Sequence, residues 1–539
     1  IGGDIKDALA TDPRIYIPGT GGREIQCAGG HNRANTLTLD GIANDDTFGL
    51  NSNGYPVNRQ PFPILMVDQM SMEIAPFDVE YGHFTACNIN VLTRSGSNEF
   101  KAIYDRKFRP TSYNGDKVGD TDVDRPEKID NVSAFFSGPI IEDKLFFSFS
   151  YEDHEEGVAA ITRGPGLLLD TATQSDAITA SDVSQVQSIA QSVYGVNAGN
   201  VAGSGATETE TTYFKLTGFI DDVHRFEASY LDTEGSNPDL QNKGKFGSDD
   251  TLSLSSSHYN TDEEMQTLQL KLFSDWSDTL STEFSYAQRE TDKLVASNGQ
   301  FAETTIKTSG GGNIQIGSDR FRHANALTQE TENYKAKVSK IMGDHVIKAG
   351  YEYDYYDVYN IFVERSLGAV AYDSIADFQN QNASDLEVRL PDSGVAIDGA
   401  GVWDRELHTI YIQDDWQVDP ELSVILGLRL DRYESSFKPR ENPAFVTANG
   451  ISNSKFIDGL DHLSPRVGLT YTPNSNFTLR AGYGEYTGGD PSVWISNVAS
   501  NTGFVAKNTN DSTVADFANF DLLNLPTAVV NSAKTAASA

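Results

Sequence analysis

The sequence has no apolar run long enough to cross a membrane as a helix. A spanning helix needs about 18 or more consecutive apolar residues, and the longest compact apolar stretch, Phe62 to Val67, is far shorter. If this chain of 539 residues lies in a membrane, it must therefore lie there as a closed β-barrel. A barrel is the other structure that satisfies every backbone hydrogen-bonding group in lipid.

Basic residues are also scarce. The sequence contains 41 Lys and Arg against 77 Asp and Glu, which gives a formal charge of −36. This balance argues against nucleic acid as a partner, because binding to phosphates requires Lys and Arg. Much of the acid falls between predicted strands, as in Asp116 to Asp124 and Asp249–Asp250, and indicates an acidic, solvated outer surface.

Signals of processing and of barrel closure are missing as well. Ile1 does not open a charged segment followed by an apolar core, so the sequence shows no signal peptide. The last nine residues, NSAKTAASA, are small and polar and do not alternate as a closing strand would. We expect the chain to be a fragment that lacks sequence at both ends.

What the sequence does contain, from about residue 99 onward, is a series of alternating strands with connections of two lengths. Turns of roughly three to five residues join the strands of a pair, and loops of roughly 19 to 55 residues join successive pairs. The predicted strands are Glu99–Arg109, Ile129–Gly138, Lys144–Glu155, Thr211–Phe219, His224–Thr233, Glu263–Phe273, Thr279–Glu290, Glu332–Ile341, His345–Asp357, Leu407–Gln417, Glu421–Glu434, Leu463–Thr472 and Asn476–Thr487. In bacterial outer-membrane barrels the short turns face the periplasm and the long loops face outside. The pattern therefore predicts such a barrel in a Gram-negative outer membrane.

Side-chain alternation within the strands supports this prediction. Leu428 and Leu430 alternate with Arg429 and Asp431, for example, and successive side chains point to opposite faces, one toward lipid and one toward the lumen. A soluble sandwich would also alternate, but its connections would not sort into short and long classes. About 13 strands are predicted, whereas single-chain bacterial barrels have even counts, so we expect the barrel to be incomplete here.

Residues 1 to about 98 differ from the rest and indicate a compact mixed domain before the barrel. They are rich in Gly and Pro and contain short strand-like segments, Thr36–Leu39 and Asn88–Thr93. This region resembles the plug domain of TonB-dependent outer-membrane transporters, and in particular the Oar-like group of OmpA-related, carboxypeptidase-regulatory-like receptors. The plug motifs that carry the resemblance are Leu39-Asp40-Gly41, Asn44-Asp45, Phe48-Gly49, Tyr55-Pro56, Pro76-Phe77-Asp78-Val79, Tyr81-Gly82 and Asn90 to Phe100. The barrel motifs are Ser464-Pro465-Arg466, Arg480, Gly482-Tyr483-Gly484 and Trp494 to Asn497.

The chain departs from the family pattern in two ways. His83 and the pair Ala86-Cys87 stand where the family usually has glycines, and we expect this to change packing within the plug. The regulatory-like domain, the TonB box and the early plug are not recognised, so the sequence does not place the energy-coupling segment.

The resemblance implies a membrane all-β fold. Residues 99–539 would form the N-terminal portion of a large antiparallel transmembrane barrel, and residues 1–98 the C-terminal part of a small α+β plug in its lumen. It also implies active transport, in which the inner-membrane TonB complex pulls on the plug and opens a path for a ligand bound by extracellular loops and plug apex. Outer-membrane lipids are the other implied partner, and a companion lipoprotein or other subunit stays open.

The sequence does not identify the transported ligand. An acidic surface weakly disfavours highly anionic ligands unless a local basic pocket exists. The candidate ligand contacts lie in the polar loop of the predicted plug and are Asn44, Asp46, Phe48, Asn51, Asn53, Tyr55 and Arg59. The alternative, that these side chains only pack the plug against the barrel, stays open.

The two cysteines, Cys27 and Cys87, both fall in the predicted plug. The oxidising periplasm favours a disulfide between them. Two small buried thiols without a bond are the alternative.

An acidic cluster in the first long loop is a candidate calcium site. It consists of Asp116, Asp120, Asp122 and Asp124, whose carboxylates are the oxygen ligands that Ca²⁺ takes. The spacing lacks the Gly and the terminal Glu of an EF-hand loop. A solvated acidic loop is therefore the favoured interpretation.

No pattern in the sequence points to catalysis, and we predict neither an enzyme nor a bound cofactor. None of the nine His has a metal-ligand spacing, and no GxSxG, Walker-type loop or Cys/His ligand set is present.

Two other functions compete with active transport. A passive porin would have no globular domain before its first strand, whereas a surface adhesin or structural barrel would suit the Ser/Ala/Thr-rich segment from Asp170 to Glu210.

Overall fold

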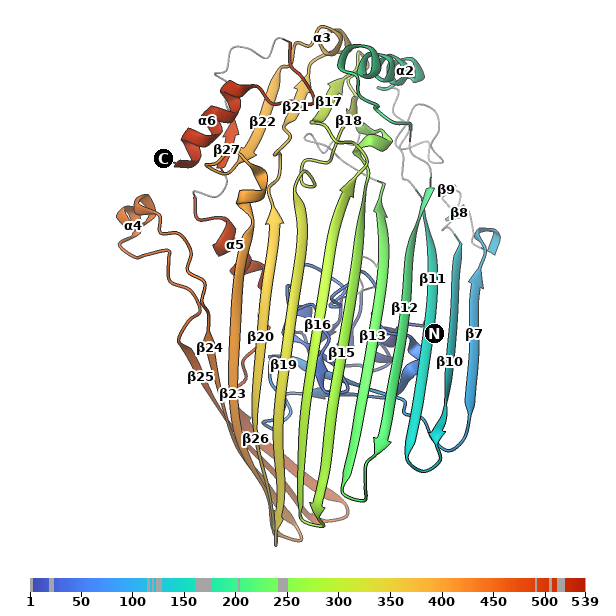
Figure 1. The fold of residues 1–539 in the computed structure, drawn as a ribbon, viewed down its shortest axis with the longest axis vertical. Helices are drawn as coiled ribbons and strands as arrows, with labels where there is room; N and C mark the ends of the chain where they lie inside the picture. Colours follow the sequence, from blue (N-terminus) through green and yellow to red (C-terminus); the bar gives the residue numbers. More distant parts are fainter. Residues whose placement is uncertain are drawn as a thin grey trace.

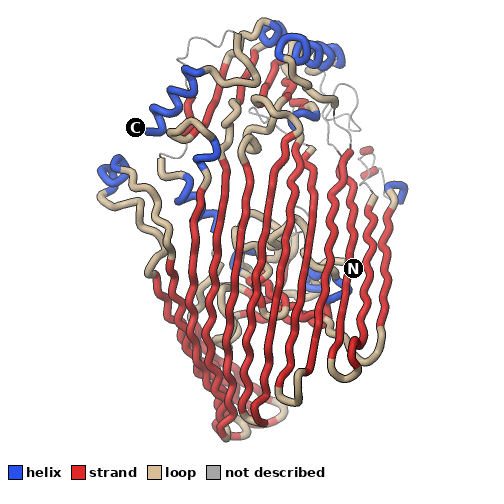
Figure 2. The backbone as a smooth tube through the Cα atoms, viewed as in Figure 1, coloured by secondary structure: helices blue, strands red, loops and turns tan. Residues whose placement is uncertain are grey.

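The computed structural model describes residues 3–18, 24–113, 117–118, 121–122, 128–159, 177–201, 204–240, 251–489, 492–503, 507–510 and 519–538. This described part has three units, which Figures 1 and 2 show: a tall curved sheet, a small N-terminal domain inside the curve, and a further layer of strands and helices at one end. Long connections leave the tall sheet at that end, and short turns close the other end.

The tall sheet has 13 strands within the described ranges, and each is hydrogen-bonded to the next in chain order. They are β7 (Lys101–Arg109), β10 (Ile129–Ile141), β11 (Leu145–Ala159), β12 (Ser204–Phe219), β13 (His224–Asp239), β15 (Tyr259–Ser277), β16 (Leu280–Ser297), β19 (Asn325–Met342), β20 (His345–Phe362), β23 (Gly401–Asp419), β24 (Leu422–Glu434), β25 (Leu460–Asn474) and β26 (Phe477–Gly484). All pairs are antiparallel, so the sheet is an up-and-down meander. Its edges are β7 and β26, and over the described residues it is not closed.

Each predicted strand corresponds to one of these 13, but several extend much further toward the long-loop end. The predicted strand Glu263–Phe273, for example, lies within β15, which has 19 residues. At about 3.4 Å per residue such a strand is about 60 Å long, about twice the thickness of the hydrocarbon core. Some extensions are polar on both faces, as in the end of β13 from Glu234 to Asp239, so the apolar alternation stops there before the strand does.

The two faces of the tall sheet sort as the alternation predicted. On β24, Leu428 and Leu430 are exposed on the outer face, whereas Arg429 is 1% exposed on the inner face. On β11, Ser148 is fully buried and its hydroxyl donates a 2.8 Å hydrogen bond to the backbone oxygen of Arg94 in the N-terminal domain. The inner face is therefore polar and is covered by that domain.

The N-terminal domain, residues 3–98, is built on a four-stranded mixed sheet with the order β4-β3-β6-β5. Its elements are α1 (Ile5–Leu9), β1 (Ile15–Tyr16), β2 (Gln26–Cys27), β3 (Thr36–Leu39), β4 (Ile42–Ala43), β5 (Val67–Ile74) and β6 (Cys87–Thr93). Leu37 and Val91 belong to its buried core, and Tyr213, Leu231 and Met265 of the tall sheet complete the same cluster. The domain therefore packs directly on the inner wall.

A second sheet covers the long-loop end, where the sequence predicted loops. Its order is β14-β18-β17-β21-β22-β27. Its strands are β14 (Thr251–Ser253), β17 (Glu303–Lys307), β18 (Asn313–Ile316), β21 (Ala369–Tyr372), β22 (Asp385–Leu390) and β27 (Lys507–Asn510), and its helices are α2 (Ala180–Ile189), α3 (Ile375–Gln379) and α6 (Thr527–Ser538). We call this unit the cap. It has an apolar core of its own, to which Val186 of α2, Ile306 of β17 and Phe378 of α3 contribute.

Several shorter elements lie in the remaining loops. They are the hairpin of β8 (Lys117–Val118) and β9 (Thr121–Asp122), α4 (Pro443–Asn449) after β24, and α5 (Ser492–Ser500) after β26. A search of the described residues for a helix with the length and apolar character of a membrane span finds none.

The predicted calcium cluster cannot be placed in this fold. Asp116, Asp120 and Asp124 lie outside the described residues, as does the side chain of Asp122. Calcium binding by this loop remains a prediction.

Candidate functional site

Basic side chains from the inner face of the tall sheet hold the N-terminal domain. Lys215 of β12 lies 3.5 Å from the carboxylate of Asp40 and 3.0 Å from that of Glu227, and Lys271 of β15 donates to the Asp40 carbonyl oxygen. The Asp40 carboxylate also accepts hydrogen bonds from the backbone N–H and the hydroxyl of Thr93, at 2.8 and 2.6 Å. This buried network fixes the ends of β3 and β6 to one part of the wall.

A second network is centred on Arg429 of β24. Its guanidinium donates to the backbone oxygen of Val79 at 3.2 Å, and it pairs with Glu352 at 3.2 Å and Asp431 at 3.0 Å. The Nε2 atom of His83 lies 3.4 Å from the same guanidinium. Arg429, Glu352 and Asp431 are all nearly fully buried. The contact with the N-terminal domain is therefore shielded from solvent.

Other bases of the inner face act in the same way. Lys337 pairs with Glu80 and Lys348 pairs with Asp78, both at 2.6 Å. Further basic side chains of the wall also reach the domain: Arg289 contacts Ala43 and Thr47, Lys293 contacts Asn51, Lys335 contacts Gly41, and Arg466 contacts Pro76 and Asp78. Much of the interface is thus polar, mostly with cations on the wall and oxygen atoms on the domain, and apolar contacts from Tyr213, Leu231 and Met265 add to it.

Sequence reasoning missed these bases. A signal was present, since single Lys and Arg residues recur on the polar faces of strands in a chain with a large negative charge. Their partners lie hundreds of residues away along the chain, so their role required the fold.

The predicted ligand contacts lie on one loop, and several are buried by packing. Phe48 is fully buried and belongs to a cluster with Tyr356 and Trp403 of the wall. Tyr55 is 1% exposed and its hydroxyl donates to Asp4 at 2.8 Å, while Arg59 forms an ion pair with buried Glu152. These contacts support the packing alternative for these three side chains.

The polar members of the same loop mostly support its own shape. The side chain of Asn51 donates to the Tyr55 oxygen at 2.9 Å, and that of Asn53 donates to the Val57 oxygen at 3.0 Å. Asn44 is 4% exposed, and over the described residues its Nδ2 has no hydrogen-bond partner. Ligand binding by this set of residues remains a prediction.

A cavity of about 90 Å³ lies between this loop and the wall, and Asp46 lines it. The charged side chains around it are Arg33, Asp45, Asp46, His83, Arg289, Lys335, Asp354 and Arg405. Burial raises the pKa of Asp45, although the charge of Arg289 opposes this shift. Burial also raises the pKa of Asp46 to about 6, against two backbone hydrogen bonds that favour the carboxylate.

The segment after β26 reaches down to the same loop. The backbone N–H groups of Ser492 and Val493, at the start of α5, donate to the oxygens of Thr47 and Phe48 at 3.2 and 2.8 Å. Just before them, Gly488 has a φ of +147°, and a Cβ there would overlap the backbone of His83. A glycine is therefore required for this close approach.

One cluster near the cavity has the composition of a metal site. The ligand atoms of His83, Glu352 and Asp354 all lie within 4.8 Å of one another. The Arg429 guanidinium, however, lies 3.2 Å from Glu352 and 3.4 Å from His83. A cation already occupies this position, so the cluster is an ion network rather than a metal centre.

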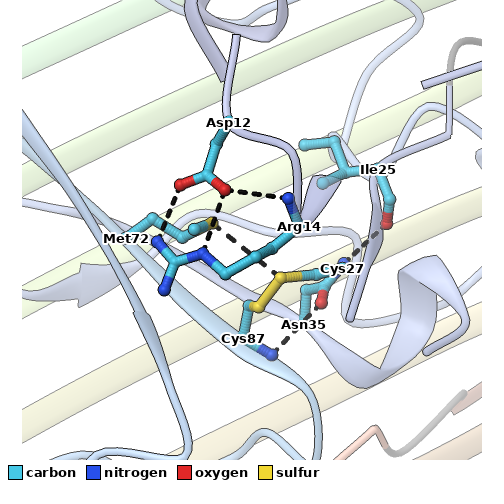
Figure 3. The surroundings of a disulfide bond; sticks show 7 residues. All are labelled: Asp12, Arg14, Ile25, Cys27, Asn35, Met72 and Cys87. Carbon is cyan, nitrogen blue, oxygen red and sulfur yellow. Dashed lines mark hydrogen bonds and ion pairs between the residues drawn. A yellow bond between two sulfur atoms is a disulfide. The ribbon is translucent and has the colours of Figure 1, made fainter. Parts of the chain in front are cut away.

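Figure 3 shows the disulfide between Cys27 and Cys87, which joins β2 to β6 across a sequence separation of 60 residues. The two Cα atoms are 6.1 Å apart, within the usual range. Asn35 lies beside it, donating to the Ile25 oxygen at 2.7 Å and accepting from the Cys87 N–H at 3.3 Å. The disulfide and the hydrogen bonds of Asn35 thus hold the same part of the domain together, where β2 meets β6.

With this geometry established, comparison with known proteins decides the family. Residues 92–539 match the family model described as "Outer membrane beta barrel domain". The chain belongs to this family. The tall sheet is thus a barrel wall in the bacterial outer membrane, and the cap lies at the outer side because long loops face outside in such barrels.

Individual proteins support the same fold. A stretch of 121 residues is 30% identical to the TonB-dependent transporter Oar of Myxococcus xanthus and covers 21% of this chain and 11% of Oar. The outer membrane transporter YddB from Escherichia coli has a TM-score of 0.63 at 14% identity, over 94% of this chain and 61% of YddB. The siderophore receptor PirA from Acinetobacter baumannii has a TM-score of 0.55 at 14% identity, over 90% of this chain and 58% of PirA. The chain therefore spans less than two thirds of each of these proteins.

The outer-membrane barrel family has the fold that the resemblance implied. The N-terminal domain lies inside the curve of the barrel wall (Figure 1), and the predictions of fold class and location are confirmed.

Proposed function

We propose that this chain forms the central part of an active transporter that moves a ligand across the outer membrane. Residues 1–98 are the C-terminal part of the plug, and residues 99–539 are the N-terminal portion of the barrel. The TonB complex of the inner membrane pulls on the plug, and the ligand binds between the extracellular loops and the plug apex, including the loop from Asn44 to Arg59. A companion lipoprotein or other subunit at the cap is compatible with this role.

The observation that carries the proposal is the character of the plug–wall contact. Ion pairs and hydrogen bonds from Lys215, Lys337, Lys348, Arg429 and Arg466 hold the plug, beside two apolar contact regions with the wall. Polar groups can exchange these partners for water when the plug moves, which costs less than exposing an equal apolar surface. A rearranging plug is what active transport requires.

A designed disulfide between plug and wall tests this proposal. A Cβ on Gly427 of β24 would lie 3.6 Å from the Cβ of Val79 in the plug, which is a distance that suits a disulfide. The full-length protein with Val79→Cys and Gly427→Cys would be compared with each single variant. Cells would be grown in rich medium, and compounds depleted by the wild type but not by a deletion strain would be identified by mass spectrometry.

We expect the double variant to lose this depletion under oxidising conditions and to regain it on mild reduction. An uncoupler of the proton gradient should abolish depletion in the wild type. The single variants control for effects of the reductant on the Cys27–Cys87 bond. Depletion that persists in the locked protein, or that ignores the uncoupler, would contradict a moving plug and favour a passive pore.

A second candidate, a surface adhesin, is favoured by the cap. Its six-stranded sheet and its own apolar core give an ordered outer surface of the kind that binds partners. An adhesin would retain binding of cells or vesicles in the locked variant and in the presence of the uncoupler, and no compound would be depleted.

A further inference from the structure

We propose that the cavity between the plug and the wall receives an anionic group, a carboxylate or a phosphate, of the transported ligand. This inference rests on the proposed function and names the chemical class of its ligand. The cavity has a volume of about 90 Å³. Arg33 of the plug, Arg289 of β16, Lys335 of β19 and Arg405 of β23 all line it, so four separate segments bring a cation to one place.

Two of these cations, Arg33 and Arg289, donate hydrogen bonds to neutral oxygen atoms, while the nearby carboxylates of Asp45 and Asp46 act on Arg289 only through their charge. Arg33 donates to the backbone oxygen of Gly49. Arg289 donates to the backbone oxygen of Ala43 at 3.0 Å and lies 3.5 Å from the hydroxyl of Thr47. Carbonyl and hydroxyl oxygens orient a guanidinium without cancelling its charge, and a charged acceptor forms a stronger bond with it. These groups are therefore arranged for an anion.

The remaining two cations have mixed surroundings. Lys335 donates to the backbone oxygen of Gly41 at 3.2 Å and lies 3.7 Å from the carboxylate of Glu352. The guanidinium of Arg405 lies 5.2 Å from the ring centre of Tyr356, a position that suits a cation–π contact. Both residues line the cavity.

The acidic groups that face the cavity are Asp45, Asp46 and Asp354. Asp354 is engaged by the side chain of Asn333 and lies 3.6 Å from His83. Four bases and three carboxylates leave one net positive charge when every carboxyl is ionised and His83 is neutral. Burial raises the pKa of Asp45, and it raises the pKa of Asp46 to about 6, so protonation of Asp46 makes the cavity more positive as the pH falls toward 6. In a chain with a net charge of −36, this is a local reversal of sign.

The size of the cavity limits what it can hold. Its volume has room for several water molecules, so it suits one terminal carboxylate or phosphate rather than a whole ligand. A basic pocket surrounded by an acidic outer surface focuses the field on the site and selects an anion by local charge. The acidic surface of the chain therefore does not decide against an anionic ligand.

Isothermal titration calorimetry of the full-length protein in detergent tests the inference, with citrate and inorganic phosphate as the anionic probes. Spermidine and glycerol serve as cationic and neutral probes. The variants are Arg289→Gln and Lys335→Gln, which remove one charge each from the cavity. The matched control is Lys348→Gln, which removes a base of the inner face that holds Asp78 of the plug and does not line the cavity.

We expect at least one anion to bind to the wild type and both cavity variants to weaken this binding by about tenfold or more. The Lys348→Gln variant should change it less than about twofold, and melting temperatures should show that the variants remain folded. If Arg289→Gln does not fold, the Lys335→Gln variant decides the result. Failure of both anions to bind to the wild type, or equal weakening in the control, would overturn the inference.

The outcome is separable from the proposed transport function. If the anion inference fails while transport holds, the cavity variants will still deplete the ligand in the uptake assay. If transport fails, anion binding in calorimetry will persist without uptake that depends on the proton gradient.

Discussion

Removing the charge of Arg429 should release one side of the plug. The residue is 1% exposed and joins the carboxylates of Glu352 and Asp431 to the backbone oxygen of Val79. In Arg429→Met both carboxylates stay buried but lose this cation, and the plug loses its hydrogen bond. Lys335, which lies 3.7 Å from Glu352, would retain part of the compensation.

The expected cost follows from this arrangement. Removing one partner of a buried ion pair costs about 3–5 kcal/mol, because a charge is left without compensation. Because Lys335 stays close to Glu352, we expect a cost at the lower end of this range, about 3 kcal/mol. Since about 1.4 kcal/mol corresponds to a factor of ten, local opening of the plug near Val79 should become about 100-fold more frequent.

Hydrogen–deuterium exchange of the full-length protein measures this opening at the amides around Val79. The matched control is Arg432→Met on the same strand, where the side chain is 54% exposed on the outer face and pairs with Glu434 at 3.1 Å. An exposed pair of this kind contributes at most about 1 kcal/mol. Equal exchange in the two variants would refute the view that Arg429 holds the plug. Adding Glu352→Gln to Arg429→Met should recover part of the loss.

Two further predictions concern the disulfide and the cap. In the full-length protein, Cys27→Ser should lower the resistance of the plug to proteolysis, since closing a loop of 60 residues contributes about 4 kcal/mol in the chain-entropy model; unchanged resistance would contradict a stabilising bond. In the cap, burial lowers the pKa of His323 to about 4, and its Nδ1 accepts a 2.9 Å hydrogen bond from the Leu367 N–H. Between pH 6.5 and 4 the imidazole of His323 binds more protons in the unfolded state than in the folded state. Keeping His323 neutral therefore contributes about 3 kcal/mol to the free energy of unfolding above pH 6.5, and this contribution is lost as the pH falls through 4. Urea denaturation of the cap, followed by proteolysis, should show the loss in the wild type and not in His323→Gln.

The sequence was sufficient for the wall because membrane strands repeat one local rule. Leu428 and Leu430 face lipid while Arg429 faces the plug, and this alternation needs no knowledge of distant residues. The cap follows no such rule. Its strands, such as β14 (Thr251–Ser253) and β17 (Glu303–Lys307), are short and come from different loops, so their pairing depends on contacts that are remote in sequence.

The candidate site was predictable only in part for the same reason. Asp46 was identified from the polar loop and does line the cavity. Phe48 and Tyr55 were predicted as ligand contacts with packing as the open alternative, and both are buried, Phe48 against the wall and Tyr55 beside Asp4. Arg289 and Arg405 face the cavity from strands whose inner faces can be predicted, but their convergence depends on how the plug sits against them.

The two stretches that carried the family resemblance, one in the plug and one in the barrel, meet in space. Arg466 of β25 donates to the backbone oxygens of Pro76 and Asp78, at 3.4 and 2.6 Å. The ring of Phe77 lies against Gly468 and Gly482, where a Cβ would come within 3.1 Å of the ring at Gly468 and would overlap it at Gly482. The motifs are thus the two halves of one interface, in which glycines make room for an aromatic side chain.

This interface gives a last prediction, for Gly482→Ala in the full-length protein. The added Cβ would lie 2.6 Å from Cε1 of Phe77 and 2.7 Å from the backbone oxygen of Val467, so the ring and the strand must shift, and overpacking of this kind costs about 1–3 kcal/mol. Exchange at the amides next to Phe77 should rise by about tenfold, whereas Ala481→Val, at an exposed position on the same strand, should leave it unchanged. In a Phe77→Ala background the Gly482→Ala substitution should cost less than in the wild type, because the clash with the ring is gone and only the approach to the Val467 oxygen remains. Additive effects of the two substitutions would show that the glycine does not serve to receive the ring.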